Sequence, residues 1–245
     1  MLFRRKSSTA FPDQVMAVWS PNGNNTAKVS WALAQALIQH TSVALVELPC
    51  LGVPRLATEA NLLDRNHHVD NAILEYERKN TPPDLFWQRP HDNLVILPAN
   101  PYALPDHPTV HKVEQLDTLK SFPNFFLNQA RKKGFSTILF DCQGGLTSPM
   151  TFFALRQAQK IILTVEHPTD LPWILINLRR LTETYNLPPS SFIATTTSPQ
   201  IRQFYEEVEQ VLPCSVLPIE KFVPALAALV SDGGANSEAK QVYAL

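Results

Sequence analysis

Residues 15–30, Val15-Met-Ala-Val-Trp-Ser-Pro-Asn-Gly-Asn-Asn-Thr-Ala-Lys-Val-Ser30, decide the fold of this chain. The apolar run Val15–Trp19 leads into a small polar loop, and apolar residues then recur at helical spacing from Thr26 onward. A strand, a polar loop and a helix in this order aim backbone N–H groups and a helix N-terminus at an anion. The stretch therefore lies where a phosphate-binding loop is expected.

The loop lacks most of the groups that hold phosphate. A working loop follows G-x-x-x-x-G-K-[S/T], in which glycines let the backbone curl, lysine neutralises charge and the hydroxyl binds magnesium. Here Gly23 remains, and Asn24, Asn25 and Thr26 stand where glycine and lysine are needed. Phosphoryl transfer depends on positioning and charge neutralisation, and one preorganised electrostatic group often contributes about 3 kcal/mol. The loss of several such groups predicts that the chain does not hydrolyse ATP.

Lys28 is the one nearby cation that could replace the missing lysine, with Ser30 supplying a hydroxyl. Two residues along a helix turn a side chain by about 200°, which points Lys28 away from the loop. The favoured interpretation is that Lys28 is a solvated helix residue, while Asn24 and Asn25 shape the turn or cap the helix. The alternative is a weak ATP site formed by Lys28, Ser30 and Asp141.

The charge balance excludes some classes of partner. The 245-residue chain carries 21 Lys+Arg against 22 Asp+Glu, a net charge of -1. Nucleic acid is therefore not expected to bind, and a membrane contact would be peripheral at most. The short basic run Arg4-Arg5-Lys6 is interpreted as a solvated tail. With 44% hydrophobic residues the chain can bury one large core, and its 7 glycines are few for a nucleotide site.

The cysteines and histidines predict no metal site. The three cysteines have no metal-ligand spacing, and their odd number argues against a disulfide framework. They are Cys50, Cys142 and Cys214, interpreted as free buried thiols in a reduced cytosol. Adjacent histidine side chains point away from each other, so they cannot share a metal ion. His67, His68 and His91 are therefore interpreted as surface residues. No long apolar segment or signal peptide is seen, so we expect a cytoplasmic protein.

Apolar segments alternate with helical patterns along the chain. Strands are predicted at 15–19, 42–48, 93–98, 136–141, 161–165, 192–197 and 215–217. Helices are predicted at 26–40, in the later part of 59–79, and at 112–133 with a break at Pro123, 148–159, 170–185, 199–212 and 223–230. This order predicts an α/β three-layer sandwich with a mostly parallel sheet of about seven strands. The expected organisation is a flexible arm over 1–13, one domain over 14–231 and a mobile tail over 232–245.

A series of motifs then follows in a familiar order. They are Asn93-Leu-Val-Ile-Leu-Pro-Ala99, Ile138-Leu-Phe-Asp-Cys-Gln-Gly-Gly-Leu146, Ala154-Leu155, Ile161-Ile-Leu-Thr-Val165 and Leu217-Pro-Ile-Glu220. The series resembles the ParA/MinD group of P-loop ATPases, which belong to the SIMIBI class and carry a deviant Walker A loop, K-G-G-x-G-K-T-T. Pilus-assembly members of the TadZ/CpaE type, whose Walker A loop is often eroded, are the most similar in character.

The resemblance assigns lost roles to particular positions. It places Pro21 at the signature lysine, Thr26 at the phosphate-binding lysine and Ala27 at the magnesium-binding hydroxyl. It places Pro49 at the acid that orients the attacking water, and Asp141 at the Walker B acid, the one acid retained. The resemblance thus implies a vestigial nucleotide site without a bound cofactor. In the alternative interpretation, ATP and Mg²⁺ are the cofactors.

Two apolar segments are candidates for protein contacts. Phe86 and Trp87 lie in the proline-rich connection TPPDLFWQRP, where they either form a docking surface or fold back as a cover. Trp173 lies on a helix that is apolar over a wide arc, which fits partner binding, dimerisation or simple core packing. The resemblance implies that this helix lies near a subunit interface.

We therefore expect a catalytically inactive scaffold or adaptor that acts through protein–protein contacts, and a homodimer fits this expectation. The resemblance suggests that it assembles or positions a pilus, a secretion system or another envelope machine. The first alternative is a weak ATP-binding switch that uses Lys28, Ser30 and Asp141. A DNA-associated partition protein is disfavoured by the near-zero net charge.

Overall fold

The computed structural model describes residues 14–23, 25–48, 55–79, 81–102, 116–142, 144–199, 201, 212 and 214–231. The predicted arm (1–13), the predicted tail (232–245), Asn24, Pro49 and Cys50 lie outside the described residues. So does nearly all of the helix predicted at 199–212.

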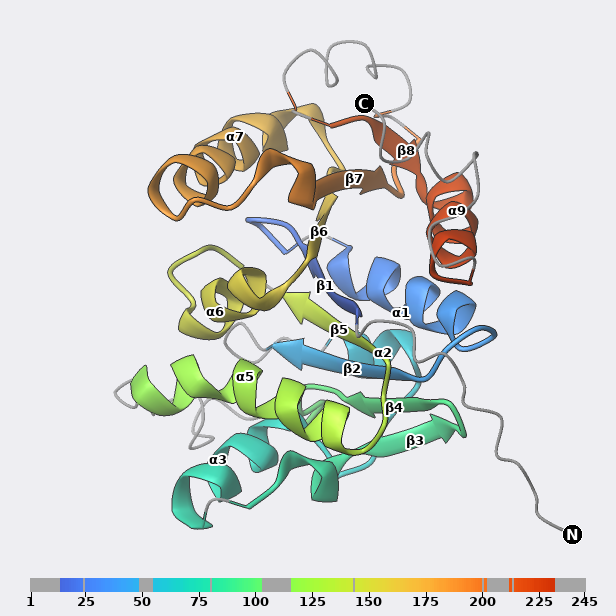
Figure 1. The fold of residues 1–245 in the computed structure, drawn as a ribbon, viewed down its shortest axis with the longest axis vertical. Helices are drawn as coiled ribbons and strands as arrows, with labels where there is room; N and C mark the ends of the chain where they lie inside the picture. The colour runs from blue at the N-terminus through green and yellow to red at the C-terminus, as the bar shows by residue number, and fades with distance from the viewer. Residues whose placement is uncertain are drawn as a thin grey trace, which may run out of the picture.

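The described part of the chain forms one eight-stranded sheet in the order β3-β4-β2-β5-β1-β6-β7-β8 (Figure 1). The strands are β1 Gln14–Trp19, β2 Val43–Leu48, β3 Gln88–His91, β4 Leu94–Leu97, β5 Thr137–Cys142, β6 Lys160–Thr164, β7 Phe192–Thr196 and β8 Val216–Pro218. Every strand pair is parallel except β3 with β4, which is antiparallel. The prediction of a mostly parallel sheet is confirmed.

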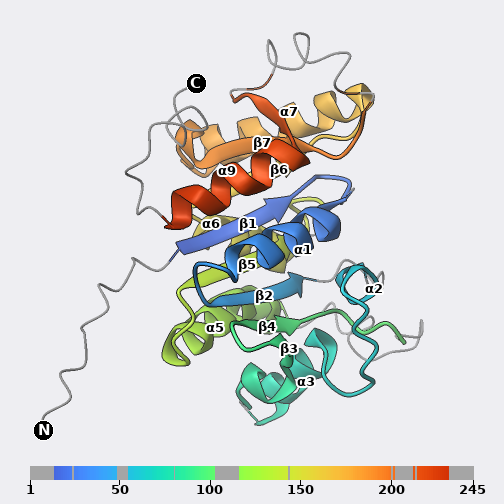
Figure 2. The same ribbon diagram turned by 90° about the vertical axis from the view of Figure 1, so that its right-hand side faces the viewer.

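Helices cover both faces of this sheet. They are α1 Thr26–Leu37, α2 Leu56–Glu59, α3 Val69–Lys79, α5 Leu116–Lys132, α6 Pro149–Gln157, α7 Leu171–Arg179 and α9 Ile219–Ser231. Short turns of 3-10 helix cover Pro83–Phe86, Pro168–Asp170 and Pro189–Ser191, and a π-helical turn over Arg180–Thr184 extends α7. Helices α1, α2 and α9 pack on one face, and α3, α5, α6 and α7 on the other (Figures 1 and 2). This is the predicted three-layer sandwich.

Alternate residues of each central strand feed the two cores. In β1, Val15, Ala17 and Trp19 face the layer of α5 and α6, while Met16 and Val18 face α1 and α9. Burial on both faces explains why these strands read as continuous apolar runs. None of the described helices is long and apolar enough to cross a membrane.

The sheet register brings the carboxyl ends of the central strands to one edge. Trp19 at the end of β1 is paired with Cys142 at the end of β5, and Cys142 is also paired with Leu48 at the end of β2. The loops that follow these strands therefore meet, as expected for ligand sites in open α/β sheets.

Several elements differ from the sequence prediction, among them the short helix α2, which was not predicted. Strand β3 was missed because its sequence, QRPH, is polar, as suits an edge strand that contains proline. The predicted break at Pro123 is wrong: α5 continues through it, with the neighbouring Phe122 and Phe126 fully buried. The packing of these rings outweighs the hydrogen bond that proline removes. Helix α9 begins at Ile219, four residues before the predicted start, and also contains a proline, Pro224.

Candidate functional site

The loop between β1 and α1 makes a tight turn. The Gly23 N–H donates to the Ser20 carbonyl oxygen at 2.9 Å, and Gly23 has φ +70. Asn25, directly before α1, has a left-handed φ of 54 and makes no side-chain cap to the helix. Of the two roles considered for Asn25, it therefore shapes the turn, which asparagine tolerates better than most residues. Asn24, between them, lies outside the described residues.

Side chains fasten this loop to the ends of β6 and β7. The Asn22 amide donates to Asp170 at 2.8 Å. The Asn25 amide donates to the Thr197 hydroxyl at 2.8 Å, and that hydroxyl donates to Glu166 at 2.8 Å. Two carboxylates are thus held against the loop, one directly and one through Thr197. Negative charge at this position opposes the binding of a triphosphate.

Asp141 lies at the centre of a buried polar cluster. Its side chain and those of Thr26 and Ser30 are fully buried. Burial, and secondarily the charge of Glu47, raise the pKa of Asp141 to about 8, although the nearby hydroxyls of Thr26 and Ser30 and the charge of Arg55 lower it. None of the four side-chain oxygens makes a hydrogen bond of normal geometry within the described residues. Burial thus favours the protonated form of Asp141.

Arg55 approaches the loop from the other side of the sheet centre. Its guanidinium packs on Gly23 so closely that a β-carbon on Gly23 would lie 2.7 Å from Nη1. Its backbone N–H donates to Glu47 Oε1 at 2.8 Å, which fixes the start of α2 beside the end of β2. The Glu47 carboxylate also accepts from Leu56 at 3.2 Å and from Ala99 at 2.7 Å. A cation from the chain itself thus occupies the neighbourhood of the loop.

Comparison with known proteins places this geometry in a fold. No protein-family model matches the chain, and no curated protein matches its sequence. A ParA family ATPase from Chlorobium tepidum matches with a TM-score of 0.66 and 13% identity, over 95% of this chain and 96% of that chain. A chain of the MinC:MinD cell division complex from Aquifex aeolicus matches with a TM-score of 0.60 and 15% identity, over 90% and 86%. The chain has the ParA/MinD fold.

A nucleotide-bound protein also shares this architecture. Cobyrinic acid a,c-diamide synthase from Mycobacterium smegmatis, solved with ADP and magnesium, matches with a TM-score of 0.64 and 18% identity, over 90% of this chain and 96% of that chain. A protein with a similar fold thus binds ADP and magnesium. Whether this chain can do so depends on its own residues at the loop.

The structure brings together only part of the predicted nucleotide site. Thr26, Ser30 and Asp141 meet where α1 begins beside β5. Lys28 is exposed on the same helix, in contrast to the buried Ser30. The hydroxyl nearest Asp141 belongs to Thr26, one residue before Ala27, where the resemblance expected the magnesium-binding hydroxyl.

Sequence reasoning missed Arg55, Glu166 and Asp170 as parts of this site. Arg55 stands eight residues after Glu47 and matches no motif, so only the fold brings it to Gly23. Glu166 and Asp170 follow β6, and their positions after an apolar strand were the available signal.

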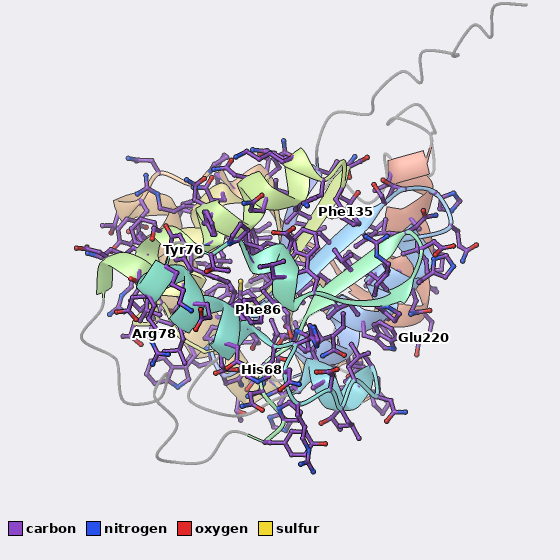
Figure 3. The ribbon with its side chains drawn as sticks, turned by 90° about the horizontal axis from the view of Figure 1, so that it is seen from below. His68, Tyr76, Arg78, Phe86, Phe135 and Glu220 are labelled. Atoms are coloured by element: carbon purple, nitrogen blue, oxygen red, sulfur yellow. The ribbon has the colours of Figure 1, made fainter. Side chains whose placement is uncertain are left out.

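The proline-rich connection folds back onto the domain. Phe86 and Trp87 are partly buried against the same hydrophobic core as Tyr76, and Figure 3 shows Phe86 and Tyr76 on this end of the molecule. The Trp87 ring meets those of Phe126 and Phe135 edge to face, at 5.8 and 5.6 Å between centroids. The segment thus folds back as a cover, and its use as a docking surface stays a prediction.

His68 is not a surface residue, contrary to the sequence interpretation. Its side chain is 2% exposed, accepts from the Asn71 N–H at 3.3 Å and lies 3.7 Å from Asp70. The ring is buried because it satisfies the N-terminus of α3. Within the described residues no group of three or more His, Cys, Asp or Glu side chains could hold a metal ion. Cys142 is buried and Cys214 partly buried, both as free thiols.

Proposed function

We propose that this chain is a catalytically inactive ParA/MinD-fold scaffold or adaptor that acts through protein contacts in the cytoplasm. The observation that carries the proposal is the packing of the Arg55 guanidinium on Gly23. In a working loop the backbone at this position surrounds phosphate. Here the Arg55 side chain fills that space, so by its bulk, and not by its charge, it keeps a triphosphate from being surrounded by the loop unless the side chain swings aside.

The charges around the loop support the same proposal. Glu166 and Asp170 are tied to the loop asparagines and repel phosphate. Lys28 is exposed and is not part of the buried cluster. Burial raises the pKa of Asp141 to about 8, so a magnesium ion would have to displace a proton from this carboxyl group. In this arrangement the residues do not fit ATP and Mg²⁺.

The proposed cellular role is inferred from the resemblance to ParA/MinD proteins and from a solved structure with the same fold. One solved protein with this fold is described as a complex of MinC with MinD, so a ParA/MinD fold serves there as a platform for another protein. By extension we propose that this chain binds a protein component of an envelope machine, such as a pilus or secretion system. Homodimerisation is part of this proposal.

A second candidate is favoured by one observation. The buried oxygens of Thr26, Ser30 and Asp141 have no hydrogen-bond partner in the described part of the chain. Buried polar groups are normally satisfied, so a ligand that reached them would gain stability. If Arg55 moved away, these groups would belong to a weak ATP-binding switch.

The decisive experiment follows thermal unfolding during titration with ATP and magnesium. A ligand at 100 times its Kd raises stability by about 2.7 kcal/mol, which corresponds to roughly 5–10 °C for a chain of this length. The scaffold proposal expects no shift at millimolar ATP and no phosphate release. A saturable shift in the wild-type chain that Lys28→Ala removes would establish the switch instead.

Arg55→Ala provides the internal control. If this variant gains an ATP-dependent shift that the wild-type chain lacks, the guanidinium is what blocks the loop. If neither chain shifts, the loop itself has lost the ability to hold phosphate. Lys120→Ala, an exposed change on α5, should leave both results unchanged.

A further inference from the structure

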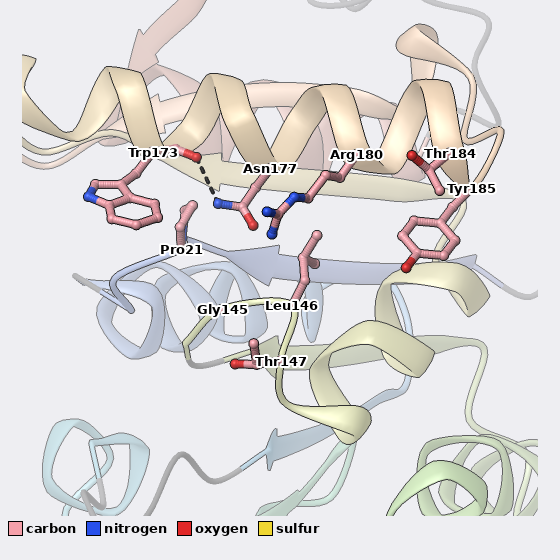
Figure 4. A pocket seen from close by; sticks show the side chains of 9 residues that line it. All are labelled: Pro21, Gly145, Leu146, Thr147, Trp173, Asn177, Arg180, Thr184 and Tyr185. Carbon is pink, nitrogen blue, oxygen red and sulfur yellow. Dashed lines mark hydrogen bonds between the residues drawn. The ribbon is translucent and has the colours of Figure 1, made fainter.

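A pocket of about 440 Å³ lies on the α7 face of the molecule, between the loop after β5 and the helix (Figure 4). It is lined by Pro21, Gly145, Leu146, Thr147, Trp173, Asn177, Arg180, Thr184 and Tyr185. Apart from Pro21 it uses none of the residues of the loop site described above. Its volume is in the range of ligand-binding pockets, about 300–1,000 Å³.

The pocket carries positive charge. Among the described residues, Arg180 is the one charged residue that lines it, and no acid does. The Arg180 side chain makes no hydrogen bond or ion pair with any residue in the described part of the chain, and Figure 4 shows it reaching from the helix toward Leu146. A guanidinium beside apolar walls can bind a carboxylate through two hydrogen bonds.

The rim of the pocket is aromatic, and one of its two rings is braced by a neighbouring ring. Trp173 is 65% exposed and Tyr185 is 43% exposed. The Tyr185 ring is braced by Phe152, at 4.5 Å between centroids, and the buried Asn177 amide donates to the Trp173 carbonyl oxygen at 2.8 Å. Trp, Tyr and Arg are the residue types that most often dominate the binding energy of protein interfaces.

The backbone at the pocket is itself unusual. Helix α7 passes into a π-helical turn at Arg180–Thr184, and both ends of that turn line the pocket. Such turns are rare and occur frequently at functional sites. The turn places Arg180 and Tyr185 on the same side of the helix end.

The apolar surface extends past the pocket. Ile176 is 46% exposed on the same helix but does not line the cavity. A small carboxylate seated in the pocket would leave Ile176 uncovered, whereas a peptide would cover both. We propose that this pocket, together with Ile176, binds a short acidic segment of a partner protein, with an apolar side chain in the pocket and a carboxylate on Arg180. This inference rests on the proposed scaffold function and names the chemistry of its partner.

The test uses the full chain labelled with ¹⁵N in its tryptophan indoles, whose Trp173 signal is assigned by its loss in Trp173→Phe. The probe is a blocked tetrapeptide of glutamate, leucine, phenylalanine and glutamate; the matched control peptide carries glutamine in place of glutamate. The acidic peptide should shift the Trp173 signal saturably. The expected Kd is about 1 mM or lower. The neutral peptide should bind at least about fivefold more weakly, since it lacks the charge-assisted bond.

Two neighbouring arginines make the variant test specific. Arg180→Gln should weaken the acidic peptide about fivefold or more while leaving the neutral peptide unchanged. Arg179→Gln, an adjacent exposed change outside the pocket, should have no such effect. Equal affinity for both peptides, equal effects of both variants, or no saturable shift up to about 5 mM peptide would overturn the proposal. A Trp173 signal that instead depends on protein concentration would assign the surface to a second copy of this chain.

The two proposals fail separately. Saturable ATP binding would overturn the scaffold function without changing the affinity of the pocket for the acidic peptide. Absence of peptide binding would overturn this inference and leave the inactive loop as it is.

Discussion

The Arg55 guanidinium lies in direct contact with Gly23, so that Nη1 is 2.7 Å from the position of a β-carbon there. Gly23 has φ +70, a region that residues with a β-carbon avoid. Gly134 has φ +84 with nothing within 4 Å of its own β-carbon position. The two glycines therefore share a backbone requirement and differ in the contact.

Gly23→Ala should destabilise the chain more than Gly134→Ala. Each change carries a backbone cost of about 1 kcal/mol, and Gly23→Ala must also displace the guanidinium. In an Arg55→Ala background the difference between the two glycines should largely disappear. Urea unfolding of the single and double variants measures this as a coupling energy. If Gly23→Ala and Gly134→Ala lower the unfolding free energy equally in the wild-type background, Arg55 does not contact Gly23 in solution.

Asp141 should make the stability fall as the pH rises. Its pKa is raised from 3.8 to about 8 by burial, so between these values the folded chain holds a proton that the unfolded chain has released. The stabilisation is fully present below about pH 4 and is lost as the pH passes through 8. Asp141→Asn should flatten this slope and raise the melting temperature at pH 8 relative to the wild-type chain.

Asp117→Asn is the control for that measurement, because Asp117 is fully exposed. It should leave the slope of stability against pH unchanged. A wild-type stability that stays level from pH 5 to 8 would show that Asp141 is ionised in the folded chain.

Glu47→Gln should be strongly destabilising for a change of one atom. The Glu47 carboxylate accepts three backbone N–H groups, from Arg55, Leu56 and Ala99. The glutamine amide would place N–H groups against N–H groups, at a cost of about 2–3 kcal/mol. Chemical denaturation should show this loss.

Glu59→Gln, on the exposed side of α2, should stay within about 0.5 kcal/mol of the wild type. Because the charge of Glu47 raises the pKa of Asp141, Glu47→Gln should also shift the pH dependence of stability toward lower pH. If the pH dependence of stability is unchanged in Glu47→Gln, the charge of Glu47 does not influence the titration of Asp141.

Trp87 should contribute to stability through its ring and not through its N–H. The ring packs on Phe126 and Phe135, whereas Nε1 is buried without a hydrogen-bond partner in the described residues. Trp87→Ala should cost about 3–5 kcal/mol, and Trp87→Phe much less, since it removes an unsatisfied donor.

Leu85→Ala is the matched change on the same turn, because Leu85 is 62% exposed. It should alter the unfolding free energy by less than about 0.5 kcal/mol. A neutral Trp87→Ala would mean that this segment is held away from the core in solution.

The architecture could be predicted from the sequence because central parallel strands are apolar on both faces. Apolar runs such as Thr137–Cys142 are recognisable as buried strands. The helical patterns between them predict the helices that cover the sheet. Strand β3 could not be predicted, because an edge strand needs neither apolar residues nor hydrogen-bond donors on its outer side. Pro123 was misjudged because local propensity took no account of the buried Phe122 and Phe126.

The site was predictable only where it follows strand ends. Asp141 and the loop around Gly23 were found because each comes directly after an apolar run. Arg55 reaches Gly23 through the fold, and His68 is buried through its contacts with α3. Such placements depend on tertiary packing, which no local pattern in the sequence encodes.

The side chain that lies on Gly23 belongs to the polypeptide, so its presence does not vary with the energy supply of the cell. If the proposed scaffold function holds, this chain keeps one shape whatever the level of ATP. A cyclic change in the proposed assembly would then have to originate in its partner proteins.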